Sequence, residues 1–326
     1  MQGTPPPKLR YNAYGFNIGG PVIFPHYNHD RQKTFFFYNM EWRKLIQGNQ
    51  INVNAIPAPE FTGDFSALAT PLRVPTTSDS AAIAKFAQYG LTPGQAFPGN
   101  KIPAGLFDPN VVKLLQTGIF PQPNTADGSH YAAAAPVPTN LREEIVRIDH
   151  QFSDKLSVMG HMIYDSSSNS YATSLWSGDT YPTIGTLLTA PSYSAVVHLT
   201  HTISPTLLNE ISYNFNGNKL NLAPTGTFQK PSGYAAQEFF PDNNLNRIPV
   251  INIGSPYGVN YDTASWPWRN VFTSHQVRDD FSWTRGNHSL KFGGSWMGTW
   301  KNQDIFGNTN GNYTFNGSAT GNSCSD

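Results

Sequence analysis

The chain has 326 residues and 21 basic against 21 acidic side chains, so its formal net charge at pH 7 is zero. A chain of balanced charge lacks the excess of basic residues that binding to a phosphate backbone requires, so we expect no nucleic-acid partner. Charged residues make up only 13% of the chain, while aromatic residues also make up 13%, which indicates a folded chain. The single cysteine, Cys324, excludes an internal disulfide and a cysteine-based zinc cluster. No apolar run approaches the length of a membrane helix.

Strand signals come in pairs, and each pair is joined by a short polar turn. The expected pairs are 14–24 with 33–46, 141–152 with 156–165, 191–203 with 207–217, and 271–284 with 289–301. Long segments rich in Gly, Pro, Asn and Ser separate the pairs, and two of them, 47–140 and 218–270, far exceed ordinary loops. We expect these segments to form a functional surface at one end of a β scaffold. Residues 109–117 predict one or two helical turns within the first segment.

Most of the expected strands alternate apolar and polar residues, which is the period of a strand with two different faces. In 207–217, Ile211 and Tyr213 alternate with Ser212 and Asn214. The segment 271–284 alternates less well, because Asp279 falls on its apolar face.

Two architectures show this pattern: a soluble sandwich with rings inside, and a membrane barrel with rings outside. The polar positions carry mostly Ser, Thr, Asn, Gln and His rather than Lys and Glu, which favours the polar lumen of a barrel. The rings also fall into two rows, as in the aromatic girdles of a barrel, although aromatic residues are common in strands of every kind. The expected lower row is Phe36, Phe152, Phe281, Trp283 and Phe292, and the expected upper row is Trp42, Tyr164, Tyr193, Phe215 and Trp300.

Several motifs in this order resemble the β-barrel of TonB-dependent receptors of the Oar-like type, which also carry a carboxypeptidase-regulatory-like domain. The matching segments are 15–23 (GFNIGGPVI), 33–41 (KTFFFYNME), 63–66 (GDFS), 147–155 (RIDHQFSDK), 287–294 (NHSLKFGG) and 313–317 (YTFNG). The resemblance implies a barrel of about 22 strands with an internal plug in the bacterial outer membrane, with short periplasmic turns and long extracellular loops. It also implies TonB-driven import of a nutrient.

The sequence shows no plug, TonB box or signal peptide, and it supplies only about eight strands. We therefore expect an all-β, antiparallel portion of a larger transmembrane barrel, that is, an internal fragment of a receptor. Its expected partners are outer-membrane lipid, the TonB complex through a plug region, and a nutrient of unidentified class, such as a glycan, a peptide or a metal chelate.

No catalytic motif is present, and we expect no enzymatic activity, no cofactor and no metal site. His26, His29 and Asp30 fit a polar turn, and His198 and His201 fall on opposite strand faces. Two sets of residues are candidate ligand contacts. The polar residues expected in the lumen are Glu41, Arg43, Arg147, Asp149, Glu210, Arg278 and Asp280; the loop aromatic residues are Tyr257, Tyr261, Trp266 and Trp268.

The sequence leaves a second interpretation open. A secreted or surface β-rich adhesion protein could recognise a glycan or a protein through the same long loops.

Overall fold

The computed structural model describes residues 8–235, 245–307 and 309–317, and its dominant feature is one antiparallel β-sheet. The expected all-β class is confirmed. The strands of this sheet are β1 (Leu9–Pro21), β2 (Thr34–Asn54), β3 (His130–Ser153), β4 (Leu156–Tyr171), β5 (Ile184–Thr189), β6 (Ser192–Ser204), β7 (Leu207–Gly226), β10 (Trp268–Arg285) and β11 (His288–Asp304). Cys324 lies outside the described residues.

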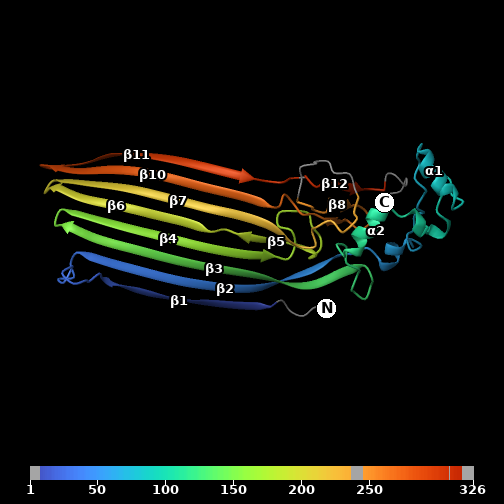
Figure 1. The fold of residues 1–326 in the computed structure, drawn as a ribbon, viewed down its shortest axis with the longest axis horizontal. Helices are drawn as coiled ribbons and strands as arrows, with labels where there is room; N and C mark the ends of the chain where they lie inside the picture. Colours follow the sequence, from blue (N-terminus) through green and yellow to red (C-terminus); the bar gives the residue numbers. More distant parts are fainter. Residues whose placement is uncertain (1–7, 236–244, 308, 318–326) are drawn as a thin grey trace.

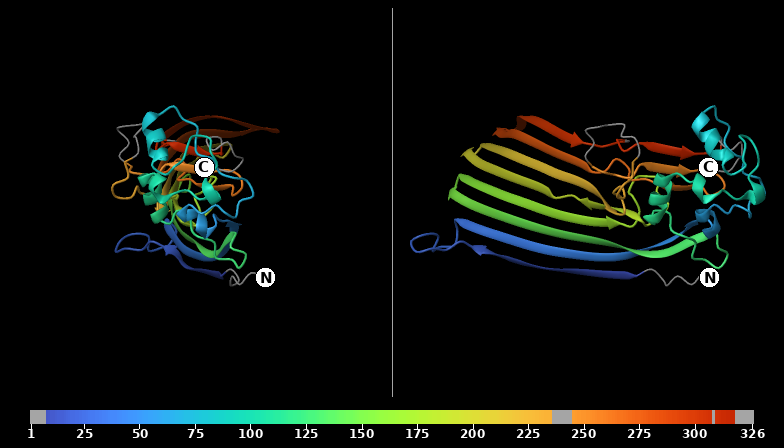
Figure 2. Two further views of the ribbon diagram at one scale, coloured as in Figure 1. Left: turned by 90° about the vertical axis from the view of Figure 1, so that its right-hand side faces the viewer. Right: turned by 45° about the vertical axis from the view of Figure 1, so that its right-hand side comes forward.

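The sheet, which we call the wall, is an antiparallel up-and-down sheet whose strands lie in the order β1-β2-β3-β4-β5-β7-β10-β11, with β6 also pairing with β4 and β7. β5 and β6 share one place between β4 and β7, with a break at Ala190 and Pro191. In the described part of the chain, β1 pairs only with β2 and β11 only with β10. Figure 1 shows the long strands side by side, and Figure 2 shows that they form a single curved layer.

The two ends of the wall differ. At one end the strands are joined by short turns, such as the one between Ser153 and Leu156 and the one between Arg285 and His288. Both α-helices and the small β8 and β12 strands gather at the other end (Figure 1). Outer-membrane barrels have the same asymmetry, with short periplasmic turns and long extracellular loops.

The strands extend further than expected at the crowded end. β2 continues to Asn54 against His130, so the segment expected as loop 47–140 is a loop only over 55–129. The second expected loop, 218–270, shortens to 227–267 because β7 reaches Gly226. The N-terminal extension of β3 was not predicted because it contains proline. Pro136 lies opposite Gly48 of β2, and the Gly48 amide donates to the Lys8 carbonyl, on the β1 side of β2, at 2.7 Å. Pro136 therefore occupies a position where no donor toward β2 is needed.

The crowded end contains several short elements. They are η1 (Ala58–Thr62), α1 (Ser80–Ala87), η2 (Pro98–Asn100), η3 (Ala104–Leu106), α2 (Pro109–Gln116), β8 (Val250–Ile253), β9 (Val259–Tyr261) and β12 (Asn312–Phe315). The helix expected within 109–117 is confirmed as α2, and Asp108 caps it by accepting from the Asn110 amide at 2.7 Å. Neither α-helix in the described residues has the length and apolar character needed to cross a bilayer.

Leu72, Val74, Leu91 and Phe97 form a small core within the first long loop. Most of the other elements pack around a larger, common core. The larger core joins Leu114 and Phe120 from the first long loop to Tyr181 from residues 172–183 and to Ile251 and Tyr261 from the third. We call the three segments together the loop domain and define it as the described residues of 55–129, 172–183 and 227–267. Since this larger core draws on all three segments, it forms only when they pack together.

Candidate functional site: the wall and the loop domain

The strand register assigns every wall residue to one of two faces, because residues directly opposite each other on neighbouring strands share a face. One apolar row crosses the whole wall through Phe36, Ile148, Gly160, Val197, Tyr213, Val277 and Trp296. The adjacent row on the opposite face runs through Phe37, Arg147, His161, Val196, Asn214, Gln276 and Met297. The first face is apolar and the second is largely polar.

All ten ring residues expected in the two rows lie on the apolar face. Neighbouring rings contact each other: Tyr164 and Tyr193 have centroids 5.1 Å apart, and Tyr14 stacks on Trp42 at 5.5 Å. This face is not covered by protein, since Trp296 is 58% exposed. A continuous exposed apolar face of this size is suited to contact with lipid.

All seven charged residues expected in the lumen lie on the polar face. Three pairs are two residues apart on one strand: Arg43 with Glu41, Arg147 with Asp149, and Arg278 with Asp280. The Arg147 guanidinium binds Asp149 through two hydrogen bonds of 2.8 Å, and Arg278 Nε donates to Asp280 at 2.6 Å. Such exposed pairs contribute about 0–1 kcal/mol each to stability, so their main effect is to line this face with matched charge.

A hollow of about 350 Å³ opens on the polar face near the short-turn end. Its lining includes Arg147, Asp149 and His198. His198 Nε2 lies 3.5 Å from Glu210 Oε1 on the next strand, at ion-pair distance but without a hydrogen bond to it. His201 lies on the opposite face, facing Leu156, so these two histidines do not share a site.

The four loop aromatic residues separate into two kinds. Tyr261 is fully buried and donates to the Thr227 carbonyl at 2.7 Å, and Trp266 is 2% exposed with Nε1 bound to Thr186 at 3.0 Å. These two form the core, which corrects their assignment as ligand contacts: their rings are occupied by packing and cannot reach a ligand. Tyr257 lines a cavity of the loop domain, and Trp268 is the first residue of β10.

Trp176 is an exposed aromatic residue that sequence analysis missed. It is 66% exposed and has a φ of 56°, a backbone conformation that is uncommon for a bulky residue. Its ring makes edge contacts with Trp266 at 5.9 Å and with Trp268 at 5.8 Å. Nothing in the sequence around position 176 indicated this, because the three rings meet only through the fold.

A family model described as an outer membrane beta barrel domain matches residues 1–326. The chain belongs to this outer-membrane β-barrel family. Outer-membrane barrels have an apolar outer face, a polar inner face and long loops at one end, and this chain has features that correspond to all three. Comparisons with curated proteins and with solved structures give no match.

Two ionisable groups, the buried Arg247 and the half-buried Asp179, bind other parts of the loop domain of this barrel family member. Arg247 is 1% exposed, and its guanidinium donates to the carbonyls of Trp266 and Phe306 and to the Thr309 hydroxyl. Burial lowers its pKa to about 10. Asp179 accepts from the Asp262 amide at 3.2 Å, and burial raises the pKa of its carboxyl to about 8. Both groups are structural, since each is enclosed by backbone.

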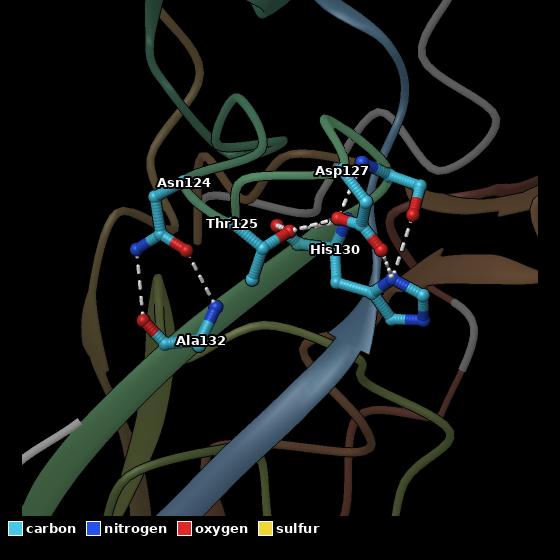
Figure 3. A network of polar contacts seen from close by, with 6 residues as sticks. Asn124, Thr125, Asp127, His130 and Ala132 are labelled. Atoms are coloured by element: carbon cyan, nitrogen blue, oxygen red, sulfur yellow. Dashed lines mark hydrogen bonds and ion pairs between the residues drawn. The ribbon is translucent and has the colours of Figure 1, made fainter. Parts of the chain in front are cut away.

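A polar network closes the first long loop where it enters β3 of the barrel wall (Figure 3). Asn124 exchanges two hydrogen bonds with the Ala132 backbone, at 2.7 and 2.8 Å. Ser129 and Asp127 both contact Nδ1 of His130, at 2.7 and 3.2 Å. A catalytic triad needs its acid and its nucleophile on different ring nitrogens, so this arrangement is a turn-closing network.

The GDFS motif has a local structural role. Gly63 has a φ of 84°, and a side chain there would meet the Ile102 carbonyl at 2.6 Å. Asp64 pairs with Lys101 at 2.7 Å and accepts from the Ser66 amide at 3.0 Å, which lowers the pKa of its carboxyl to about 2. The motif therefore fixes the turn that follows η1. No cluster of three metal-ligating side chains occurs among the described residues.

Proposed function

We propose that the chain is part of a TonB-dependent receptor of the Oar-like type, which binds a nutrient at its loop domain and imports it with energy transmitted by TonB. The observation that carries this proposal is the combination of a lipid-suited wall with one folded loop domain at its exterior end. A passive barrel needs no such domain, whereas a receptor needs a structured surface for capture.

The polar face supports a path for the ligand below the loop domain. In a barrel this face lines the interior, and here it carries both acids and bases in matched pairs. We propose that Glu41, Arg43, Arg147, Asp149, Glu210, Arg278 and Asp280 contact a plug or a passing ligand. Tyr257, Trp268 and Trp176 are the proposed aromatic contacts at the loop domain. The proposed role is binding and import without catalysis.

The test is genetic, because the nutrient is not identified. Strains lacking the receptor gene, lacking TonB, or lacking both are grown on panels of single glycan, peptide and metal-chelate sources. We expect at least one source on which the receptor and TonB deletions fail equally, with no further loss in the double deletion and with recovery when the receptor gene is restored.

A different result would support surface adhesion. If the receptor deletion changes attachment to glycan or protein surfaces while every growth phenotype is unaffected, import is contradicted.

A further inference from the structure

The loop domain contains an open cavity of about 570 Å³, and Tyr257 is the one candidate contact named above that lines it. Four parts of the chain form it: the segment around η1, the segment around η3, one side of α2, and the β8–β9 hairpin. The first three parts come from the loop 55–129 and the last comes from the loop 227–267. The cavity therefore exists only when the two loops are packed together. Its volume is in the range of sites for small organic molecules.

The walls of the cavity are almost entirely apolar. Rings and aliphatic side chains form them: Ile56, Phe61, Phe65, Ile102, Phe107, Val111, Val112, Leu115 and Ile253. One ionisable acid, Glu60, and one tyrosine, Tyr257, also line the cavity. An apolar site with a few convergent polar groups is the usual form of a small-molecule site.

Glu60 is 8% exposed, and the Tyr257 hydroxyl donates to its carboxylate oxygens. Among the described residues, no Lys, Arg or His forms an ion pair with Glu60. Lys113, the only basic residue of α2, donates instead to the Gly233 carbonyl. Burial raises the pKa of the Glu60 carboxyl, in keeping with a carboxylate that lacks a counter-ion.

The charged form of a buried carboxyl held only by a neutral hydroxyl is disfavoured, and a cation close to it would offset this cost. The open side of the cavity gives a ligand access to this group, and the surrounding walls favour an apolar body. An ammonium group would supply the missing charge and could donate to the carboxylate beside Tyr257.

We propose that this cavity binds a small organic ammonium ion with an aromatic or branched apolar body, and that Glu60 is its counter-ion. The inference rests on the proposed function in that the loop domain faces the exterior, and it narrows the ligand class. Binding is measured on the purified chain without TonB, so its failure and a failure of import are separate results.

The experiment compares tryptamine with tryptophol, in which a hydroxyl replaces the ammonium group on the same indole body. The full chain is held in lipid nanodiscs, because detergent could occupy an apolar cavity, and binding is measured by isothermal titration calorimetry. We expect tryptamine to bind at least about tenfold more tightly than tryptophol, since charge-assisted hydrogen bonds are about twice as strong as neutral ones.

Three variants distinguish the carboxylate from the cavity. Glu60→Gln keeps the shape and removes the charge, so the tenfold preference should fall to about onefold. Glu143→Gln removes the same group from the polar face of the wall and should leave the preference unchanged. Val111→Trp fills the cavity from α2 and should abolish the binding of both probes.

Equal affinity of the unmodified chain for tryptamine and tryptophol would overturn the proposal, as would a tenfold preference that survives in Glu60→Gln. Limited proteolysis of the loop domain checks that each variant is folded. If Glu60→Gln does not fold, Val111→Trp decides the matter, because tryptamine binding that persists with a filled cavity also overturns the proposal.

Discussion

Phe281 and Phe292 stack across β10 and β11, with ring centroids 5.5 Å apart and planes inclined by 12°. Both lie on the apolar face near the short turns, and Phe292 is 55% exposed. A stacked pair that faces away from protein stabilises the strand pair and offers its outer surface to lipid. This relationship joins the local pairing of the wall to its membrane setting.

The stack predicts measurable coupling between the two rings. We expect a double-mutant cycle with Phe281→Leu and Phe292→Leu to give a coupling energy of about 0.5–1.5 kcal/mol, as for other aromatic pairs. The free energy of unfolding is measured by urea titration in lipid vesicles. Additive effects of the two substitutions would show that the rings do not interact.

The middle of the apolar face should not tolerate charge. Trp296 lies midway between Phe292 and Trp300 on β11, so Trp296→Lys should lower the free energy of unfolding in vesicles by about 2–4 kcal/mol. Met297→Lys is the matched control. Met297 follows Trp296 on β11 and lies on the polar face, so this substitution should change the free energy of unfolding little. Equal losses from the two substitutions would contradict the assignment of the faces.

Removing the buried guanidinium should loosen the loop domain. Arg247→Met leaves the buried carbonyl of Trp266 without this donor, at a cost of about 1–3 kcal/mol. We expect faster hydrogen exchange over residues 245–267, while the wall strands stay protected. Arg269→Met, which removes an exposed guanidinium from β10, should leave exchange unchanged. Unchanged exchange in Arg247→Met would show that the guanidinium does not hold the domain together.

Asp179 predicts a pH dependence of the loop domain. The pKa of its carboxyl rises from 3.8 to about 8 in the folded chain, so the folded state holds a proton that the unfolded state has released. The stabilisation from this proton is complete below about pH 4 and is lost as the pH rises to about 8. Thermal unfolding measured between pH 5 and pH 9 should therefore show a falling midpoint.

Asp179→Asn provides the control for this effect. An amide does not titrate, so most of the fall in the midpoint between pH 5 and pH 9 should disappear. The Asp262 carboxylate raises the pKa of Asp179. In Asp262→Asn the pKa of Asp179 should be lower, so the midpoint of thermal unfolding should fall at a lower pH. A fall of the same size in Asp179→Asn would assign the pH dependence to another group.

The wall could be predicted from the sequence because its alternation is imposed by two different environments. Ile211, Tyr213 and the polar residues between them read clearly, and the register places them as expected. The parts of the strands next to the loop domain were not predicted. There a proline, as at Pro136, or a short strand, as in β5, obscures the alternation of apolar and polar residues. These parts pack against the core of the loop domain, as Val53, Tyr131 and Ile184 do, so strict alternation is not required there.

The candidate site was less predictable. Charged residues of the polar face followed from parity alone, and all seven share the face expected for them. The loop domain depends on contacts across long stretches of sequence, such as the hydrogen bond from Tyr257 to Glu60, which are 197 residues apart. No local pattern marked Glu60 as buried or Trp266 as core, because both environments arise only when separate segments of the chain pack together.

The wall has one face suited to lipid and one polar face, and labels on β7 can distinguish these faces because β7 has strand neighbours on both sides. Nitroxide labels are placed one at a time at residues 211–216, in a Cys324→Ser background, and their accessibility to oxygen and to a water-soluble nickel chelate is measured in lipid vesicles. We expect a period of two, with oxygen access higher at 211, 213 and 215 and access of the nickel chelate higher at 212, 214 and 216. Equal access of the nickel chelate to both sets would contradict this expectation.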